Sequence, residues 1–342
     1  MAKFQFILDF IFIFFIKSLG AIQTSKDDPS QISKPINRML NQDWKIFKNF
    51  VHVETEDSAK DLTWRRKFEE SYELISRHNI EFQLNPEKVK YRLKLTEYAH
   101  MTDEEFMKKK TGLKINRKSR KKTIKEKRAI SDPKRPKTYD SRTKYPIPPR
   151  DQGDCGGCYA FSAVASIEFQ LAKKNKITSL SEQNLIDCSG GFGNFGCNGG
   201  IMDAAFEYMI SNKGINSLLF YPYVAKQESC KFKSNYIGAK LKGYGYANTE
   251  EELEDAIYKY GAVSCGIDAS LPTFRLYADG IYNDTKCSKT DINHAINVVG
   301  YTENTFICRN SWGTAWGMGG YFELPKGENT CGLISYCVYP IL

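Results

Sequence analysis

The sequence predicts an α+β fold with two lobes, because helix-like and strand-like patterns separate along its second part. Residues 158–171 form an Ala-rich run that is apolar on most sides, as expected of a buried helix. Residues 180–212 indicate further helices, interrupted by a Gly-rich loop over 189–200. After Gly214 come short alternating or apolar runs that are typical of strands. These runs cover residues 262–269, 294–301, 305–310 and 320–324.

Residues 1–21 predict an export signal. Lys3 precedes a Phe- and Ile-rich stretch, and Ser18-Leu-Gly-Ala21 provides small residues for a cleavage site. The uninterrupted apolar run from Phe10 to Ile16 is far too short to cross a bilayer. We therefore expect a chain that enters the secretory pathway and has no stable membrane span.

Residues 22–107 predict a small helical region without cysteine. Apolar side chains recur at helical spacing from Trp64 to Phe82, which indicates one long amphipathic helix. Thr102 is followed by three acidic residues and then Phe106, a pattern that marks a helix start.

Positive charge is concentrated in one segment. The whole chain carries +9, but residues 129–342 hold 21 Lys and Arg against 22 Asp and Glu. The excess lies mainly in residues 108–128, which contain 12 basic residues and one acidic residue. Such a run also suits nucleic-acid binding or nuclear targeting. Behind an export signal it fits a solvated, protease-sensitive linker better, so no nucleic-acid partner is expected.

All ten cysteines fall in the second part of the chain. Clustered cysteines behind an export signal predict disulfides formed in an oxidising compartment. A zinc site is not expected, because no second Cys-x-x-Cys completes four ligands and the one histidine after residue 128 has no partner at ligand spacing. No other cofactor is expected.

Three residues form a candidate reactive group. Cys158 starts the predicted buried helix, where unpaired N–H groups and the helix dipole favour thiolate over thiol. His294, 136 residues later, is the one base available, and Asn310, another 16 residues on, would orient its ring without neutralising it. A helix end and an imidazolium together move a thiol pKa from about 8.5 to about 3.5–7.5.

Gln152 adds a donor to this group. It lies six residues before Cys158, and its side-chain N–H would form an oxyanion hole with the Cys158 backbone N–H. Cys158 belongs to the helical half, and His294 and Asn310 belong to the strand half. We therefore expect the site in the cleft between the two lobes.

Four motifs in this order resemble the papain-like cysteine proteases, and among them the cathepsin L group most closely. They are the segments 152–162, 196–200, 293–295 and 310–317. The resemblance implies a papain-like two-lobed fold, with a helical lobe, a β-barrel-like lobe and the site in the cleft, preceded by a small helical propeptide. It implies a cysteine endopeptidase that hydrolyses peptide bonds through a thioester acyl-enzyme and is made as an inactive precursor.

The resemblance also assigns roles to matching residues. Its catalytic set is Cys158 as nucleophile, His294 as acid and base, Asn310 as orienting residue and Gln152 as oxyanion donor. Trp312 would shield the contact between His294 and Asn310 from water, and Gly200 would offer its backbone to the substrate. The pocket for the second residue upstream of the cut would comprise Met202, Cys265, Gly266, Ile292 and Tyr336.

Disulfide pairs follow from the same resemblance. The implied pairs are Cys155–Cys197, Cys188–Cys230 and Cys287–Cys331. Cys265, Cys308 and Cys337 are then left over, and we expect them to be buried thiols that pack as small apolar groups.

Departures from the family pattern modify these expectations. Gly157 and Tyr159 replace the usual Ser and Trp, and Asn293 replaces the Asp of cathepsin L, which predicts a changed pH range with the same mechanism. Tyr336 at the pocket floor predicts a preference for Leu or Val over Phe; alternatively, this side chain only packs. Exopeptidase members carry an extra loop between the residues that match Cys197 and Cys230, and the spacing of 33 here leaves no room for it.

The leader resembles the family's inhibitory propeptide, with Phe68, Ile75 and Asn79 at matching positions and Trp64 and Ser71 as departures. Alternatively, it is an amphipathic helix with no inhibitory role. We expect a signal peptide at 1–21, a propeptide at 22–128 and a peptidase domain at 129–342, with Lys127-Arg128 as one plausible cleavage point.

A second motif of the leader differs more strongly from the family pattern. Where the family has Gly, Asn, Phe and Asp at alternate positions, this sequence has Lys94, Thr96, Tyr98 and His100. We hypothesise that protonation of His100 at low pH loosens the leader. The alternative is an ordinary exposed histidine on a polar helix end.

The sequence therefore predicts a secreted or lysosomal cysteine endopeptidase that is a monomer. Its partners would be protein and peptide substrates, its own propeptide and cystatin-like inhibitors. Two alternatives stay open: a catalytically silent binding protein and a transferase that passes the thioester to an amine. Asn283-Asp-Thr285 is a sequon for N-glycosylation, although many sequons stay unused.

Overall fold

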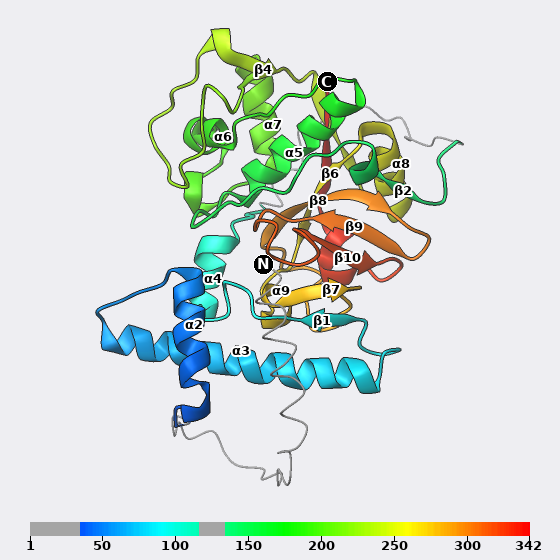
Figure 1. Cartoon of the computed structure of the whole chain (residues 1–342). Helices are drawn as coiled ribbons and strands as arrows, with labels where there is room; N and C mark the ends of the chain where they lie inside the picture. Colours follow the sequence, from blue (N-terminus) through cyan, green and yellow to red (C-terminus); the bar gives the residue numbers. More distant parts are fainter. Residues whose placement is uncertain (1–34, 116–133) are drawn as a thin grey trace. The chain divides into compact units, whose positions relative to one another are not determined.

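A computed structural model describes residues 35–115 and 134–342 of the chain (Figure 1). The predicted export signal and the predicted cleavage point Lys127-Arg128 lie outside the described residues. Residues 38–342 make up one folded unit, to which every element below belongs. No helix in the described ranges is long and apolar enough to cross a membrane.

Residues 35–115, called the proregion below after the propeptide that the resemblance implies, contribute three α-helices and one strand to this unit. They are α2 (Asn41–Val51), α3 (Ser58–Leu84), β1 (Tyr91–Leu93) and α4 (Asp103–Lys110). Asp57 caps α3 by accepting the N–H groups of Ala59 and Lys60. Thr102 and Glu105 form a capping box on α4, with acidic residues in its first turn and lysines in its last. The helix predicted over 64–82 and the start predicted at Thr102 are confirmed.

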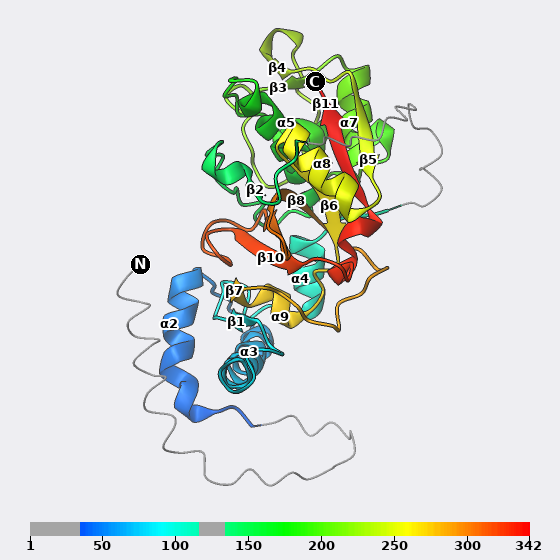
Figure 2. The same ribbon diagram turned by 90° about the vertical axis from the view of Figure 1, so that its right-hand side faces the viewer.

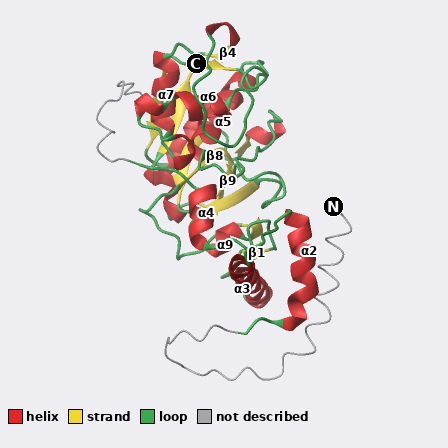
Figure 3. Cartoon of the chain, turned by 90° about the vertical axis from the view of Figure 1, so that its left-hand side faces the viewer, coloured by secondary structure: helices red, strands yellow, loops and turns green. Residues whose placement is uncertain are grey.

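A helical lobe follows. It consists of α5 (Cys158–Lys173), α6 (Glu182–Cys188), α7 (Met202–Ser211) and the strand pair β3 (Ile215–Asn216) and β4 (Ile237–Ala239). Figures 1 and 3 show the three helices packed together. Helix α5 is buried from Cys158 to Leu171, as its apolar sequence predicts.

The other lobe is a seven-stranded sheet with the order β10-β9-β8-β6-β11-β5, and β2 pairs with β8 beside this path. Figure 2 shows α8 beside β6 and β5. Two further elements, α9 and β7, precede β8. The bounds are β2 Tyr139–Asp140, β5 Gly243–Ala247, α8 Glu250–Tyr260, β6 Val263–Ile267, α9 Pro272–Arg275, β7 Tyr277–Gly280, β8 His294–Tyr301, β9 Thr305–Arg309, β10 Tyr321–Pro325 and β11 Cys337–Ile341.

Short 3-10 helices connect these elements. They cover Arg38–Leu40, Ser141–Thr143, Gly190–Phe192, Gly196–Asn198, Ser234–Tyr236 and Thr330–Ser335.

The proregion and the sheet lobe share one apolar core. Phe68, Tyr98 and Phe106 of the proregion belong to the same buried cluster as Phe274 and Trp312 of the sheet lobe. The helical lobe has a second core, which includes Cys158. The proregion is thus packed as a further layer of the sheet lobe.

The three implied disulfides are present, and a fourth corrects the expectation for the leftover cysteines. Cys265 and Cys337 are bonded to each other, and only Cys158 and Cys308 remain unpaired among the described residues. The reason is strand register: Cys265 on β6 lies directly opposite Cys337 on β11, with their Cα atoms 4.1 Å apart. This register depends on the folded sheet and was not visible in the sequence.

Candidate active site

Helix α5 places Cys158 against strand β8. Cys158 is the first residue of the helix and is fully buried. One turn further on, Ser162 fixes the helix to the sheet: its hydroxyl donates to the Ile296 carbonyl (2.8 Å), and its own carbonyl accepts from the Asn297 side chain (2.9 Å). The Cys158 thiol consequently lies beside the backbone N–H of Ala295, the residue after His294.

His294 is held on one side of its ring. Its Nε2 is 2.8 Å from Asn310 Oδ1, which also accepts the Ser311 backbone N–H at 2.8 Å. Since an amide oxygen only accepts, Nε2 carries the hydrogen in the neutral ring and Nδ1 keeps its lone pair. Within the described residues Nδ1 has no hydrogen-bond partner, and the Trp312 ring lies 4.7 Å from the His294 ring.

Gln152 is oriented by a neighbour of Asn310. The Ser311 hydroxyl donates to Gln152 Oε1 at 2.6 Å, which fixes the amide so that Nε2 points away from Ser311. Nε2 donates to the backbone carbonyls of Cys155 (3.0 Å) and of Lys110 in the proregion (3.2 Å). The Lys110 carbonyl also accepts from Trp312 Nε1 at 3.1 Å. The side-chain N–H of Gln152 that is predicted to bind the oxyanion is therefore already hydrogen-bonded to a peptide carbonyl of the proregion.

The next proregion residues continue along the site through backbone hydrogen bonds. Gly112 and Leu113 donate their N–H groups to the Asn293 carbonyl at 3.0 and 2.9 Å. Gly200 donates to the Gly112 carbonyl (2.8 Å) and accepts from the Lys114 N–H (3.0 Å). Both backbone groups that the resemblance assigns to substrate at Gly200 are thus occupied.

Two glycines permit this close passage. A Cβ on Gly112 would lie 2.1 Å from the Gly156 carbonyl oxygen, and a Cβ on Gly156 would lie 2.7 Å from the Thr111 carbonyl oxygen. Both distances are far below a normal contact. Any side chain at either position would push the proregion away from the residues before Cys158.

The predicted substrate pocket is filled by Leu113. A Cβ placed on Gly266 would meet Leu113 Cδ2 at 2.6 Å, Ile292 Cγ2 at 2.7 Å and Tyr336 Cδ1 at 3.6 Å, so these side chains converge there. Met202 belongs to the same buried cluster. Tyr336 is fully buried, and its hydroxyl accepts the Asp203 N–H of α7 at 3.3 Å.

Burial sets the charge state of the reactive pair. It raises the pKa of the Cys158 thiol to about 12 and lowers the pKa of His294 to about 4. These directions are opposite to the thiolate–imidazolium pair that the sequence favours. The physical reason is burial away from water, which penalises both charged forms. Burial therefore favours the neutral thiol and the neutral imidazole in this state.

Further from the site, the proregion docks on the sheet lobe. Strand β1 pairs antiparallel with β7, with Tyr91 opposite Gly280. The Tyr98 hydroxyl donates to the Trp312 carbonyl at 3.2 Å. The rings of Tyr98 and Phe106 pack against the Trp312 ring at 5.8 and 5.2 Å. Trp312 is thus covered by the proregion as well as packed on His294.

The proregion motif residues build its own core. Phe68 is fully buried between the rings of Trp44 and Phe47. Ser71 donates to the Ala99 carbonyl at 2.7 Å, and Asn79 exchanges two hydrogen bonds with the Leu93 backbone, each 2.9 Å. These contacts hold β1 and the residues after it against α3.

His100 lies inside this core, which corrects the alternative of an exposed histidine. It is 7% exposed, and its ring packs edge-on against those of Phe47 and Trp64. Burial lowers its pKa to about 4. The polar sequence around it did not reveal this, because its cover comes from α2 and α3.

Sequence reasoning missed the residues that block the site, Lys110 to Lys114. Their contacts are mostly backbone to backbone, which leaves almost no side-chain signature. The signal available was Gly112 followed by the apolar Leu113 in an otherwise basic run. It also missed Ser311 as the residue that orients Gln152, although it follows Asn310 directly.

A buried thiol at a helix start, an imidazole held by an amide and a side-chain donor for a peptide carbonyl together define a site for acyl transfer to sulfur. The described residues contain no group of three or more side chains able to hold a metal ion. The thiol, the imidazole and the amide donor define the class of protein as a thiol-dependent hydrolase of peptide bonds, with its N-terminal region bound at the site.

Comparison with known proteins identifies the family. A model described as "Papain family cysteine protease" matches residues 135–341. The chain is 38% identical over 324 residues to a cathepsin L-like peptidase of Aedes aegypti, covering 89% of this chain and 94% of that protein. It is 40% identical over 293 residues to procathepsin L of Felis catus, covering 82% and 87%.

Solved structures of related precursors lead to the same family. The digestive procathepsin L2 proteinase from the larval midgut of Tenebrio molitor aligns with a TM-score of 0.82 at 30% identity, covering 89% of this chain and all of that one. The chain belongs to the papain family of cysteine proteases. The predicted two-lobed fold, the cathepsin L-like cysteine endopeptidase activity and the precursor form are confirmed.

Proposed function

We propose that Cys158, His294, Asn310 and Gln152 carry out peptide-bond hydrolysis once the proregion has left. Exposure to water would restore the charged pair, and the Cys158 thiolate would then attack the substrate carbonyl carbon. The oxyanion would be held by Gln152 Nε2 and the Cys158 backbone N–H. His294 would give its proton to the leaving amine and then take one from the water that cleaves the thioester. Asn310 would orient the ring in both steps.

The observation that carries this assignment is the Lys110 carbonyl. It accepts hydrogen bonds from Gln152 Nε2 at 3.2 Å and from Trp312 Nε1 at 3.1 Å. An amide donor that already binds one peptide carbonyl at this position is suited to bind the carbonyl of a substrate. The same contact supports the proregion as the inhibitor, because it excludes substrate from that donor.

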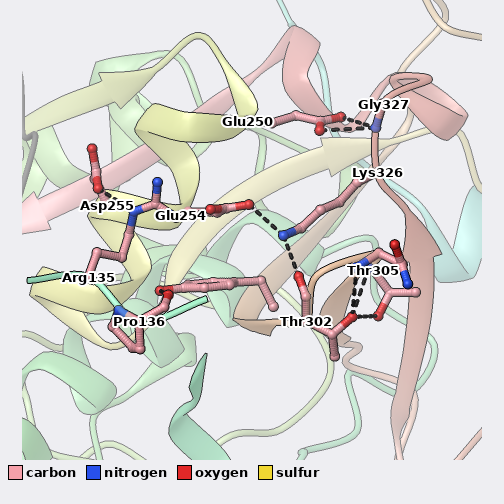
Figure 4. A network of polar contacts seen from close by, with 11 residues as sticks. Arg135, Pro136, Glu250, Glu254, Asp255, Thr302, Thr305, Lys326 and Gly327 are labelled. Atoms are coloured by element: carbon pink, nitrogen blue, oxygen red, sulfur yellow. Dashed lines mark hydrogen bonds and ion pairs between the residues drawn. The ribbon is translucent and has the colours of Figure 1, made fainter. Parts of the chain in front are cut away.

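We also propose the boundary between propeptide and peptidase near residue 128, with residues from Arg135 onward belonging to the enzyme. Figure 4 shows Arg135 among acidic residues of α8, with its Nε 2.6 Å from Asp255 and its Nη1 bonded to Glu254. Glu254 also binds Lys326 at 2.5 Å. The Tyr301 hydroxyl donates to the Pro136 carbonyl at 3.1 Å. A cut after Arg135 would break this network.

The pocket filled by Leu113 supports a substrate preference. Gly266, Ile292 and Tyr336 converge on a branched aliphatic side chain of the protein's own sequence. We propose that this pocket takes Leu or Val as the second residue upstream of the cut. The mature enzyme would act in the lysosome or outside the cell as a monomer, and inhibitors of the cystatin type would compete for the same site.

The test acidifies the purified precursor, sequences the new N-terminus and labels the product with an epoxide thiol trap. We expect cleavage before Arg135, labelling that Cys158→Ser abolishes, and hydrolysed peptides in the product mixture. A matured chain that takes up no label would instead be a silent binding protein. Products joined to an added amine, with no free acid, would indicate a transferase.

A further inference from the structure

The asparagine of the sequon at 283–285 binds the proregion. Asn283 Oδ1 accepts the backbone N–H of Lys90 at 3.3 Å, and Asn283 Nδ2 donates to the backbone carbonyl of Lys88 at 2.9 Å. Lys88 and Lys90 flank Val89 just before β1, and both of these backbone groups face the Asn283 side chain. The side-chain amide thus pairs with the proregion as a neighbouring peptide group would.

Residues on both sides of Asn283 contact the same stretch. The Ile281 N–H donates to the Lys90 carbonyl at 2.8 Å, and the Tyr91 hydroxyl donates to Asp284 Oδ2 at 3.2 Å. Asp284 Oδ2 is fixed in turn by the Thr273 hydroxyl at 2.8 Å. Asn283 is therefore the middle contact of an edge that holds the proregion at three successive points, which leaves its side chain little freedom to turn away.

A glycan would change this amide at the atom that makes the contact. N-glycosylation replaces one hydrogen on Nδ2 by a sugar carbon. The resulting secondary amide is planar and prefers the trans form, which puts the sugar carbon on the same side as Oδ1. In an amide that binds two backbone groups through Oδ1 and Nδ2 together, this is the side of the donated hydrogen. The sugar and the Lys88 carbonyl therefore compete for one position.

We propose that Asn283 is a proregion-recognition residue and that its sequon carries no glycan in the latent precursor. This inference rests on the proposed function, because it takes the proregion to be the inhibitor. It assigns the sequon a regulatory meaning: a chain glycosylated at Asn283 would hold its proregion less tightly and mature sooner.

The test uses the full chain secreted from insect cells, as wild type, Thr285→Ala and Asn283→Ala. Thr285→Ala is the matched control, because it removes the sequon but keeps the amide and changes an exposed side chain. Peptide mass spectrometry before and after peptide N-glycosidase treatment measures occupancy of Asn283. We expect no glycan on the latent wild type. On acidification, Thr285→Ala should mature at the wild-type rate and Asn283→Ala on the order of tenfold faster, since two hydrogen bonds are lost.

A glycan on most of the latent wild-type chain would overturn the inference, and so would equal maturation rates in the two variants. If Asn283→Ala is not secreted, Asn283→Asp replaces it, because this variant keeps the shape and loses the donor. Labelling of Cys158 by the thiol trap after maturation separates the two claims. Labelled enzyme with equal rates refutes only the role of Asn283, whereas absence of label in every chain refutes the proposed function as well.

Discussion

The docking part of the proregion, residues 41–106, and its blocking segment, residues 110–114, contact the enzyme through different kinds of interaction. The docking part shares an aromatic core with the sheet lobe around Trp312 and adds strand β1 to β7. The blocking segment is held mainly by hydrogen bonds of its backbone to Gln152, Asn293 and Gly200. Docking therefore depends on particular side chains, whereas blocking depends on where docking places the backbone.

This difference means that one part of the proregion supplies the binding free energy, while another part blocks the active site. Backbone hydrogen bonds of the blocking segment are the kind that a substrate would also make, so they provide little advantage over substrate by themselves. The buried rings of the docking part supply the additional free energy that keeps the segment in the site. Changes in the docking part should consequently release the enzyme without touching any residue near Cys158.

The largest effect is expected for Phe68→Ala. Phe68 is fully buried between Trp44 and Phe47, and removing a buried Phe side chain costs about 3–5 kcal/mol. The precursor should hydrolyse a small peptide substrate at neutral pH, before any processing. Leu84→Ala on the same helix is the control, because Leu84 is 70% exposed. A Phe68→Ala precursor as latent as the control would show that docking does not sustain inhibition.

His100→Phe should make activation require a lower pH. Burial lowers the pKa of His100 to about 4; the charged groups around it are Glu105, Lys109 and Arg275, and the backbone of Glu97 accepts a hydrogen bond from its ring. Only the released proregion takes up a proton near the ordinary value of about 6.5, so docking is strongest above that pH and weakens as pH falls toward 4. The shift corresponds to on the order of 3 kcal/mol, and Phe removes it.

The pH at half-maximal maturation rate measures this effect. His52→Gln is the matched control, because His52 is an exposed histidine of the same region. Identical pH profiles for His100→Phe and wild type would show that protonation of His100 does not control activation. Other titrating groups of the precursor, His294 among them, would then have to explain activation by acid.

Within the blocking segment we expect one side chain to matter. Leu113 is 5% exposed and fills the pocket at Gly266, so Leu113→Ala should weaken blocking by about 2 kcal/mol or more. Lys114 is exposed, and Lys114→Ala should have little effect. The rate of thiol-trap labelling of Cys158 in the intact precursor at neutral pH reports the difference. Equal acceleration by both variants would mean that the backbone alone carries the block.

The smallest effect concerns the mature enzyme. If the pocket that holds Leu113 also holds the second substrate residue upstream of the cut, the enzyme should prefer Leu there. Matched substrates with Leu and Phe at this position should then differ about tenfold in kcat/KM in favour of Leu. Tyr336→Ala should reduce this preference, because it deepens the floor. Equal cleavage of the two wild-type substrates would mean that Tyr336 only packs.

The sequence by itself determined the two lobes, the helix that begins at Cys158, and the residue types of the site. Local periodicity and short motifs carry these features, and the physics that links them to structure acts over a few residues. The pairs at Cys155, Cys188 and Cys287 followed from a resemblance to known proteins, because spacing alone does not define connectivity.

Tertiary structure alone decided the pairing of Cys265 with Cys337, the burial of His100 and the direction in which the pKa of Cys158 moves. Each depends on which distant segments meet: the register of β6 against β11, the cover of α2 and α3 over His100, and the burial of Cys158 where α5 meets β8. Strand register is set by packing over the whole sheet, and burial of a side chain depends on segments that are far apart in the sequence. No short window of the chain contains that information.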